Sequence, residues 1–324
     1  MGYSRNIMES PKTLQAAILF FANPDNCVAY MVAQRWPDGV VICPTCGRND
    51  VTWLKAQRKW QCKSQHSKRQ FSAKVGTIFE DSPLGLDKWL MATWMITNCK
   101  NGVSSYEIAK AIGVTQKSAW FMLHRIRVAM DEPNAGKLGG HGPIEIDETF
   151  VGGKMKNVHK SKRIGSLNYQ GGNGKAIVMG MLERGGKVRA GVIVDRKIES
   201  MRPPVQNNIE AGSHIITDEF PTYPWIAKDA YFHEIINHIE GYVRDHIHTN
   251  GIENFWSLLK RGLGGTYVSV EPFHLDAYVV EQAFRYNNRR DHNDATRFAK
   301  VISQVTGKRL TYAEVTGKVN ETAF

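Results

Sequence analysis

The sequence predicts a multi-domain α/β protein, and three observations support this prediction. The chain has 324 residues, which is long for one domain and suits two or three. Its composition changes from a cysteine cluster, through a helical stretch, to a glycine-rich joint at 136–142. After that joint, several strand-like segments precede the last helices, an order typical of a mixed α/β domain.

Charge and cysteine usage narrow the class of protein. The chain holds 42 Lys and Arg residues against 31 Asp and Glu, a formal charge of +11. Such an excess favours a polyanionic partner, with nucleic acid ahead of a membrane surface. The five cysteines, three of them clustered, indicate a metal site in a reduced compartment rather than a secreted disulfide framework. We therefore expect a cytoplasmic protein.

The first apolar run, LQAAILFFA at 14–22, is too short to cross a membrane. No convincing small-residue cleavage motif follows it, which argues against a signal peptide. We interpret the run as a buried helix within an N-terminal helical segment, residues 1–35, and expect no membrane partner.

The next segment, 36–82, has the ligand spacing of a zinc ribbon. Cys43 and Cys46 flank a tight Pro-Thr turn that directs two thiolates at one point. Fifteen residues separate Cys46 from Cys62, and His66 follows as Cys-x3-His. Zinc accepts three sulfurs and one imidazole, so these four residues are the predicted ligands of a structural Zn²⁺. Since a second CxxC pair is incomplete here, a water or another histidine is the alternative fourth ligand.

Residues 83–135 predict a helix-turn-helix DNA-binding region. The segments 104–112 and 116–130 have helical patterning around a glycine turn, and Thr115 can cap the second helix. In such motifs the second helix enters the major groove. Its exposed face is expected to carry Gln116, Lys117, His124, Arg125 and Arg127. The alternative is an ordinary helical hairpin that packs against protein.

Residues 140–300 are expected to form the mixed α/β domain, and 301–324 a C-terminal tail. The sequence ERGG at 183–186 is typical of a hairpin turn. Alternation predicts a strand at 143–150, the hairpin turn is flanked by predicted strands at 175–182 and 187–195, and short apolar runs predict strands at 214–217 and 232–237. Helical spacing predicts helices at 250–261 and 274–290.

Three acids on this framework suggest a metal-dependent active site. Asp147 lies in the first strand, Asp218 directly follows a later strand, and Glu253 is near the start of a helix. In an RNase H-like sheet such strands lie side by side, and a following helix can bring its carboxylate to their ends. Oxygen ligands suit Mg²⁺ or Mn²⁺, and two such ions can promote phosphodiester cleavage. Strand alternation should direct Glu145 and Asp147 to one face and Glu148 to the other.

Other side chains compete for the third position of this site. Asn250, Asp245 and Glu281 are the alternatives to Glu253. Trp256, one turn beyond Glu253, is interpreted as core packing that fixes the helix, with base stacking as its alternative role.

These residues lie in longer segments that resemble the IS1595-family (ISXO2-like) insertion-sequence transposases of the DDE type. The resemblance extends along nearly the whole chain. The matching segments are RWPDGVVICPTCG at 35–47, WQC at 60–62, RQFSAKVGTIFEDS at 69–82, IEIDETFVGGKMKNVHKSKR at 144–163, IITDEF at 215–220 and HTNGIENFWSLLKRGLGGTY at 248–267.

The resemblance implies a zinc-ribbon and DNA-binding N-terminal part followed by an RNase H-like catalytic domain. It puts the catalytic acids, which would also bind Mg²⁺, at Asp147, Asp218 and Glu253. The family often ends its ribbon with a second CxxC, a pattern from which this chain departs.

A member of this family is expected to bind the terminal inverted repeats of its element. It would cleave a phosphodiester with two divalent metals and join the freed 3′-OH to target DNA. We expect a homodimer or larger assembly when two ends are paired, in a bacterial cytoplasm and associated with the nucleoid. Basic side chains should follow the DNA backbone without reading sequence: Lys154, Lys156, Lys160, Lys162, Arg163, Lys260 and Arg261.

Two other functions remain compatible with the sequence. One is a zinc-ribbon and helix-turn-helix DNA-binding regulator whose last domain is inactive, which would never cleave DNA. The other is an RNase H-like structure-specific nuclease that hydrolyses strands without joining them. Strand-transfer products on a supplied target would distinguish both from a transposase.

Overall fold

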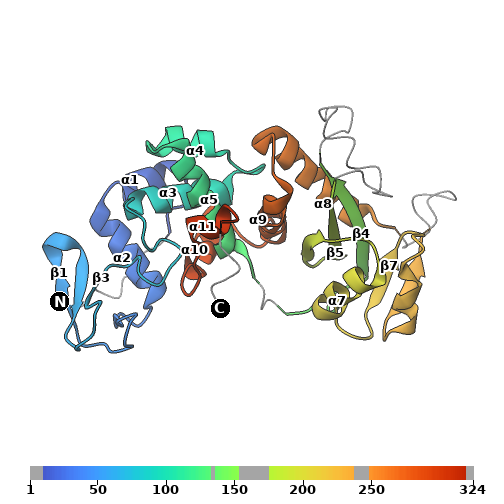
Figure 1. The fold of residues 1–324 in the computed structure, drawn as a ribbon, viewed down its shortest axis with the longest axis horizontal. Coiled ribbons are helices and arrows are strands. Elements are labelled where there is room, and N and C mark those ends of the chain that lie inside the picture. The colour runs from blue at the N-terminus through green and yellow to red at the C-terminus, as the bar shows by residue number, and fades with distance from the viewer. Residues whose placement is uncertain (1–9, 133–135, 153–174, 237–247, 319–324) are drawn as a thin grey trace. The chain divides into compact units, whose positions relative to one another are not determined.

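The computed structural model describes residues 10–132, 136–152, 175–236 and 248–318. The chain divides into two compact units (Figure 1). The first unit comprises residues 1–131 and 288–324, and the second comprises 132–287.

The first unit opens with α1 (Leu14–Phe21) and α2 (Pro24–Arg35). Phe21 is fully buried, whereas Leu19 is 70% exposed. The expected N-terminal helix is therefore present, but only one of its faces is buried. Within the described residues, no single helix is long and apolar enough to span a membrane, and α1 and α2 meet such a criterion only as a pair bent by 106°.

A small antiparallel sheet follows, formed by β1 (Val51–Leu54), β2 (Lys59–Cys62) and β3 (Gln70–Phe71) in that order. The side chain of Trp60 is buried at its centre. Its ring packs against those of Trp36, Trp53 and Phe71, and these aromatic contacts give a short sheet the apolar core it needs.

Three helices complete the N-terminal part of this unit: α3 (Leu86–Asn98), α4 (Ser105–Ile112) and α5 (Gln116–Met130). The chain turns between α4 and α5 at Gly113, whose φ of 64° is left-handed and suits glycine. Thr115 then caps α5, as predicted, by accepting a hydrogen bond from the backbone N–H of Ser118.

The C-terminal helices α10 (Asp294–Ser303) and α11 (Tyr312–Val315) belong to the same unit. Phe298 of α10 is fully buried, and its ring packs against those of Phe21, Tyr30 and Trp94. This differs from the expected domain at 140–300 with a tail at 301–324. The apolar face of α10 finds its partner in α3, so the second unit ends at residue 287.

The second unit is built on a five-stranded sheet of order β6-β5-β4-β7-β8. Strands β6, β5 and β4 pair antiparallel, whereas β4, β7 and β8 pair parallel. All five strands lie where the sequence predicted them: β4 (Ile144–Val151), β5 (Ala176–Glu183), β6 (Val188–Ile193), β7 (His214–Thr217) and β8 (Phe232–Ile235).

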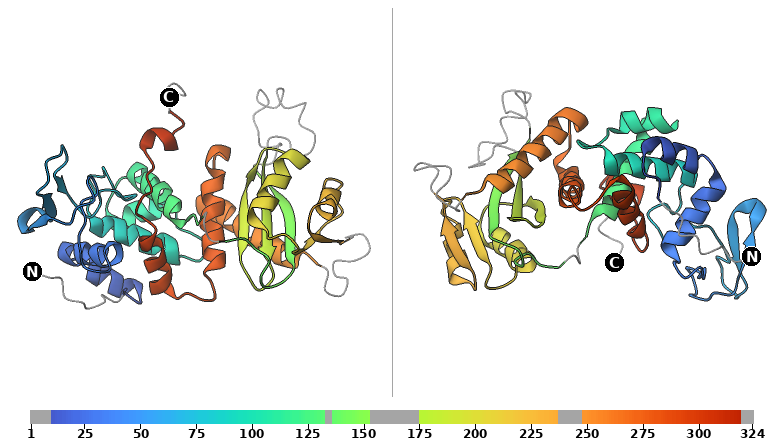
Figure 2. Two further views of the ribbon diagram at one scale, coloured as in Figure 1. Left: turned by 90° about the horizontal axis from the view of Figure 1, so that it is seen from below. Right: turned by 180° about the vertical axis from the view of Figure 1, so that it is seen from behind.

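Helices cover both faces of this sheet (Figures 1 and 2). On one face, α7 (Ile198–Asn208) and the 3-10 helix η4 (Tyr223–Lys228) pack on side chains that include Ile144 and Ile146 of β4. The opposite face is covered by α8 (Asn250–Arg261) and α9 (Leu275–Asn287), which are joined by a π-helical turn η5 (Gly262–Tyr267) and a 3-10 turn η6 (Pro272–His274).

Candidate functional site

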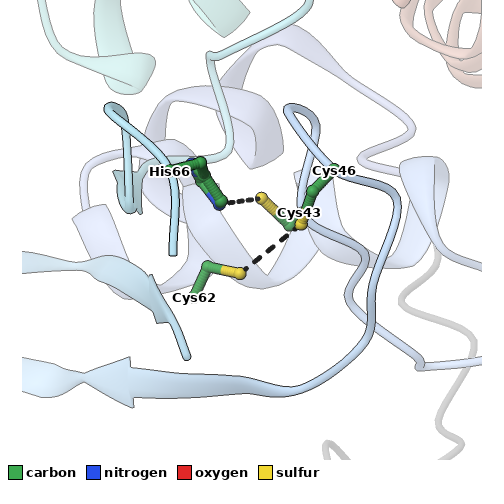
Figure 3. Close-up of side chains that lie close together, drawn as sticks. All are labelled: Cys43, Cys46, Cys62 and His66. Atoms are coloured by element: carbon green, nitrogen blue, oxygen red, sulfur yellow. Dashed lines mark hydrogen bonds between the residues drawn. The ribbon is translucent and has the colours of Figure 1, made fainter. Parts of the chain in front are cut away.

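The four predicted zinc ligands meet in the first unit. Their ligand atoms all lie within 4.8 Å of one another, and Figure 3 shows the four side chains pointing toward one point. The Cys46 and Cys62 sulfurs are 3.7 Å apart, and Cys43 Sγ lies 3.5 Å from His66 Nε2. Zinc bonds of about 2.3 Å in a tetrahedron separate two sulfurs by about 3.8 Å. The arrangement therefore fits a structural Zn²⁺ with His66 as the fourth ligand.

Backbone geometry prepares the first two ligands. The Gly47 N–H donates to the Cys43 carbonyl oxygen at 2.9 Å, and Gly47 has a left-handed φ of 74°. A hydrogen bond from the backbone of Arg48 lowers the pKa of the Cys46 thiol, which favours the thiolate that binds metal. With four protein ligands the site has no open position for chemistry.

The helical pair differs from the predicted DNA-reading surface. The expectation that His124, Arg125 and Arg127 face outward is wrong, because their exposed fractions are 2%, 4% and 1%. Arg125 donates to the Glu80 carbonyl oxygen at 2.5 Å and lies over the Trp89 ring. Helical periodicity predicted the helix, but it did not reveal that α5 packs against protein on more than one side.

The first turn of α5 remains accessible. Lys117 is exposed, and its Nζ lies 5.0 Å from the centre of the Tyr312 ring. Gln116 is half-buried and donates to the Ser105 hydroxyl at the start of α4. Of the residues predicted on this helix to bind DNA, only these two can reach a ligand from outside.

In the second unit, Asp147 and Asp218 stand at the same level of neighbouring strands. β4 and β7 run parallel, with Glu145 beside Ile216. Two residues further along come Asp147, within β4, and Asp218, directly after the end of β7. If the register continues, the two acids share a level and a face of the sheet. The carboxylate of Asp218 accepts the N–H of Phe220 at 3.1 Å.

Asp147 faces α8 beside a glycine of the neighbouring strand. Its Oδ2 accepts a hydrogen bond from Trp256 Nε1 at 2.9 Å. The strand partner of Asp147 is Gly180, where an added Cβ would lie 2.6 Å from the indole of Trp256. A glycine is required there for the indole to reach the acid. Trp256 is 4% exposed, so the predicted core role is correct but incomplete.

Burial is the main cause that raises the pKa of Asp147, to about 6. The hydrogen bond from Trp256 opposes this shift, and the neighbouring charges of Asp218 and Glu253 add to it. The three acids therefore interact electrostatically, at a cost that a bound cation would relieve. The ligand atoms of the four zinc ligands lie within 4.8 Å of one another, whereas in the described structure those of the three acids do not.

Glu148 points to the opposite face from Asp147, as alternation predicted. It accepts a hydrogen bond from the hydroxyl of Tyr223, which is fully buried in η4. Burial, together with the charges of Asp147 and Asp218, raises the pKa of Glu148 to about 7. From the sequence, Glu148 had only been placed on the face opposite to Asp147, and its contact with Tyr223 was not predicted.

Glu253 is exposed on the first turn of α8, and its Oε1 accepts the Thr249 hydroxyl at 3.1 Å. Of its rivals, Glu281 is fully buried and pairs with Arg285 within α9. Asn250 is exposed at the first position of α8, and Asp245 lies outside the described residues.

The basic residues fall into two groups. Lys260 is exposed two turns after Glu253, a spacing of seven that keeps both on nearly the same face of α8. Its neighbour Arg261 is also exposed. The remaining predicted DNA contacts lie outside the described residues: Lys154, Lys156, Lys160, Lys162 and Arg163.

Two family models match this chain. A model described as an ISXO2-like transposase domain matches residues 137–287, and one described as a transposase zinc-ribbon domain matches residues 22–66. The first match covers the five-stranded sheet with α7, α8 and α9, and the second ends at the last predicted zinc ligand. Together they cover more than half of the chain.

Individual relatives give a consistent result. An uncharacterized protein in transposable element ISH50 of Halobacterium salinarum is 29% identical over 72% of this chain and 82% of that protein. An uncharacterized transposase-like protein of Haemophilus influenzae is 28% identical over 32% of this chain and 82% of that protein.

Among solved structures, a simian T-cell lymphotropic virus intasome in complex with PP2A regulatory subunit B56 gamma matches with 15% identity and a TM-score of 0.27. The match covers 59% of this chain and 64% of the intasome chain. At this TM-score the likeness supports no structural argument.

Proposed function

This chain belongs to the ISXO2-like transposase family, and we propose that it is a DNA transposase of the DDE type. The observation that carries this proposal is that Asp147 of β4 and Asp218, directly after the neighbouring parallel strand β7, lie at the same level, with Glu253 on the helix that covers that face. We assign metal binding to these three acids, as the sequence predicted.

The sheet order supports an RNase H-like fold for the second unit. Three antiparallel strands are followed by two parallel ones, and helices cover both faces. The first strand of the unit, β4, lies at the centre beside β7. This order places Asp147, in the middle of β4, beside the end of β7, which Asp218 follows.

The donor set supports Mg²⁺ or Mn²⁺ as the cofactor. Asp147, Asp218 and Glu253 offer only oxygen atoms, which these hard cations prefer. The raised pKa of Asp147 reflects burial and two neighbouring carboxylates, a combination that a divalent cation would compensate. When bound, the metal would stabilise the negative charge that develops on the phosphoryl oxygens.

The proposed reaction consists of two in-line displacements. Water attacks the phosphodiester at the element end, a P–O bond forms, and the bond to the 3′ oxygen breaks with a proton transferred to that oxygen. The freed 3′-OH then attacks a target phosphodiester and displaces its 3′ oxygen, which takes the proton. Within the protein, Trp256 holds Asp147 in place, and positioning with charge neutralisation supplies catalysis without a covalent intermediate.

DNA binding is assigned to both units. The zinc ribbon and the helix pair of the first unit would bind the inverted repeats as a helix-turn-helix, with only the first turn of α5 near base edges. In the second unit, Lys260 and Arg261 would neutralise phosphates beside the acids. We expect at least a dimer when two ends are held together.

Cleavage of a labelled element end in Mg²⁺ tests this function. Asp147→Asn and Asp218→Asn should each lower the rate by on the order of 10²-fold or more. Glu219→Gln is the matched control, because Glu219 is an exposed acid next to Asp218. Equal rates for the wild type, Asp147→Asn and Glu219→Gln would refute the assignment of the acids.

A further inference from the structure

A second acid on β4 contacts the start of α8. Glu145 is fully buried and lies two residues before Asp147 on the same face of the strand. Its Oε2 accepts the backbone N–H of Ile252 at 2.9 Å. Ile252 is in the first turn of α8, directly before Glu253 in the sequence.

This contact replaces an ordinary helix cap. Thr249 occupies the N-cap position of α8 but makes no capping hydrogen bond with its side chain, because its hydroxyl donates to Glu253 instead. The first N–H groups of a helix need partners from outside the helix, and the carboxylate of Glu145 supplies one with favourable charge. A Cβ at Gly251 would lie 2.8 Å from Glu145 Oε2, so a glycine permits the close approach.

An arginine connects the same carboxylate to the residue before the helix. Arg184, directly after β5, donates from Nε to Glu145 Oε1 at 2.7 Å. Its second terminal nitrogen lies 2.5 Å from the His248 carbonyl oxygen and 3.0 Å from His248 Nδ1. The His248 ring nitrogen is also 3.4 Å from Glu145 Oε1. Glu145 therefore has several partners, as a buried carboxylate requires.

The result is a two-point attachment of α8 to β4. Glu145 binds the helix at Ile252, and Asp147 binds it at Trp256, one turn later. Glu253 lies between these two contacts. Its carboxylate is exposed and makes its own bond to Thr249, so the backbone position of the helix decides where Glu253 stands relative to Asp147.

We propose that Glu145, held by Arg184 and His248, is a positioning residue that fixes the start of α8 so that Glu253 serves the same site as Asp147. This inference rests on the proposed function. In this role Glu145 contacts neither DNA nor metal and acts through the backbone of α8.

The test uses the full-length protein with three substitutions. Glu145→Ala removes the hydrogen bond to the Ile252 N–H and the ion pair with Arg184. Glu145→Gln keeps an oxygen that can accept the Ile252 N–H. The matched control is Glu183→Gln. Glu183 is another buried acid of the same sheet, 4% exposed, and it accepts N–H groups from Gly139 and His141 rather than from α8.

Two measurements separate positioning from general destabilisation. The first is the rate of end cleavage as a function of Mg²⁺ concentration, with DNA-end binding measured in parallel. The second is amide hydrogen exchange over residues 249–256, which needs no activity.

We expect Glu145→Ala to lower the maximal rate by on the order of 10- to 100-fold and to raise the Mg²⁺ concentration that gives half the maximal rate. Binding of the DNA end should not change, and exchange in 249–256 should accelerate. For Glu145→Gln, the cleavage rate and the amide exchange in 249–256 should lie between those of the wild type and Glu145→Ala. Glu183→Gln should change neither.

Two results would overturn the inference: exchange in 249–256 that does not respond to Glu145→Ala, or a Mg²⁺ dependence that Glu183→Gln changes as much as Glu145→Ala. Absence of cleavage by the wild type would instead refute the proposed function. In that case the exchange measurement alone decides whether Glu145 fixes α8.

Discussion

At the scale of single residues, the second unit concentrates negative charge beside a buried strand. Asp147 and Glu148 point to opposite faces of β4, and burial raises the pKa of each, to about 6 and about 7. The side chain of Trp256 donates to Asp147, and that of Tyr223 donates to Glu148. A neutral donor does not cancel a negative charge, and Arg196 offsets only part of the rise in the pKa of Glu148. Ionisation of these two buried acids is therefore unfavourable.

This charge predicts how stability depends on pH. Both acids bind more protons in the folded chain than in the unfolded chain, so the free energy of unfolding should fall as the pH rises. The loss should run from about pH 4, the unfolded pKa of a carboxyl, through about 6 for Asp147 and about 7 for Glu148. Asp147→Asn should flatten the curve by on the order of 2 kcal/mol.

Denaturant unfolding between pH 5 and pH 8 measures this effect. The buffer should lack Mg²⁺ and also lack a chelator, so that the ribbon keeps its zinc. Glu219→Gln should retain the slope of the wild type. Parallel curves for the wild type and Asp147→Asn would contradict the prediction.

The hydrogen bond from Trp256 gives a second prediction at this scale. Trp256→Phe keeps the ring in the core but removes Nε1–H, leaving Asp147 without its side-chain donor. We expect slower cleavage and a stability loss of about 1 kcal/mol. Trp225→Phe is the control, because the buried Nε1 of Trp225 has no hydrogen-bond partner in the described structure. Equal cleavage rates for the two variants would exclude a role for the hydrogen bond.

At the scale of elements, the sequence predicted strands more reliably than contacts. Alternation marks β4, and short apolar runs or the turn at 183–186 mark the other strands, so β4 to β8 could be located from local pattern. The approach of Trp256 to Asp147 depends on Gly180, a strand partner more than thirty positions from Asp147. The pairing of Gly180 with Asp147 depends on the register of the two strands, which local alternation does not reveal.

The zinc ribbon predicts a metal content that depends on four residues. Zinc analysis of the purified protein should give one ion per chain, and Cys43→Ser should lose it. His66→Cys should retain it, because thiolate and imidazole both suit tetrahedral zinc. Cys99→Ala should also retain it, since Cys99 lies outside the ligand group. Zinc retained after both Cys43→Ser and His66→Ala would contradict the ligand assignment.

Exposed and buried basic residues of α5 should have different roles, the exposed ones in DNA binding and the buried ones in stability. Lys117→Ala should weaken binding of the element end and leave thermal stability unchanged, because Lys117 is exposed. Arg125→Met should lower stability, because the buried Arg125 bonds the Glu80 carbonyl oxygen. Gel shifts and thermal melts of the two variants measure both effects. Unchanged binding by Lys117→Ala would remove the first turn of α5 from the interface.

At the scale of the whole molecule, the chain order and the compact units do not coincide. The first unit takes residues from both ends of the chain, since α10 packs with α3. An amphipathic helix such as α10 shows in its sequence that it needs a partner, but not which one. The order of ribbon, helices and acid-bearing domain was nevertheless predictable, because each part carries short local motifs.

Strand transfer needs DNA binding and the three acids to act in one reaction, so it is the most direct test of the proposed function. Purified protein would be mixed with a labelled, pre-cleaved element end, a plasmid target and Mg²⁺, beside the Asp218→Ala variant. We expect joined product with the wild type and none with the variant, while both bind the end in a gel shift. If neither protein joins the end although both bind it, the chain is a DNA-binding protein without this catalysis, which would contradict its assignment as a transposase.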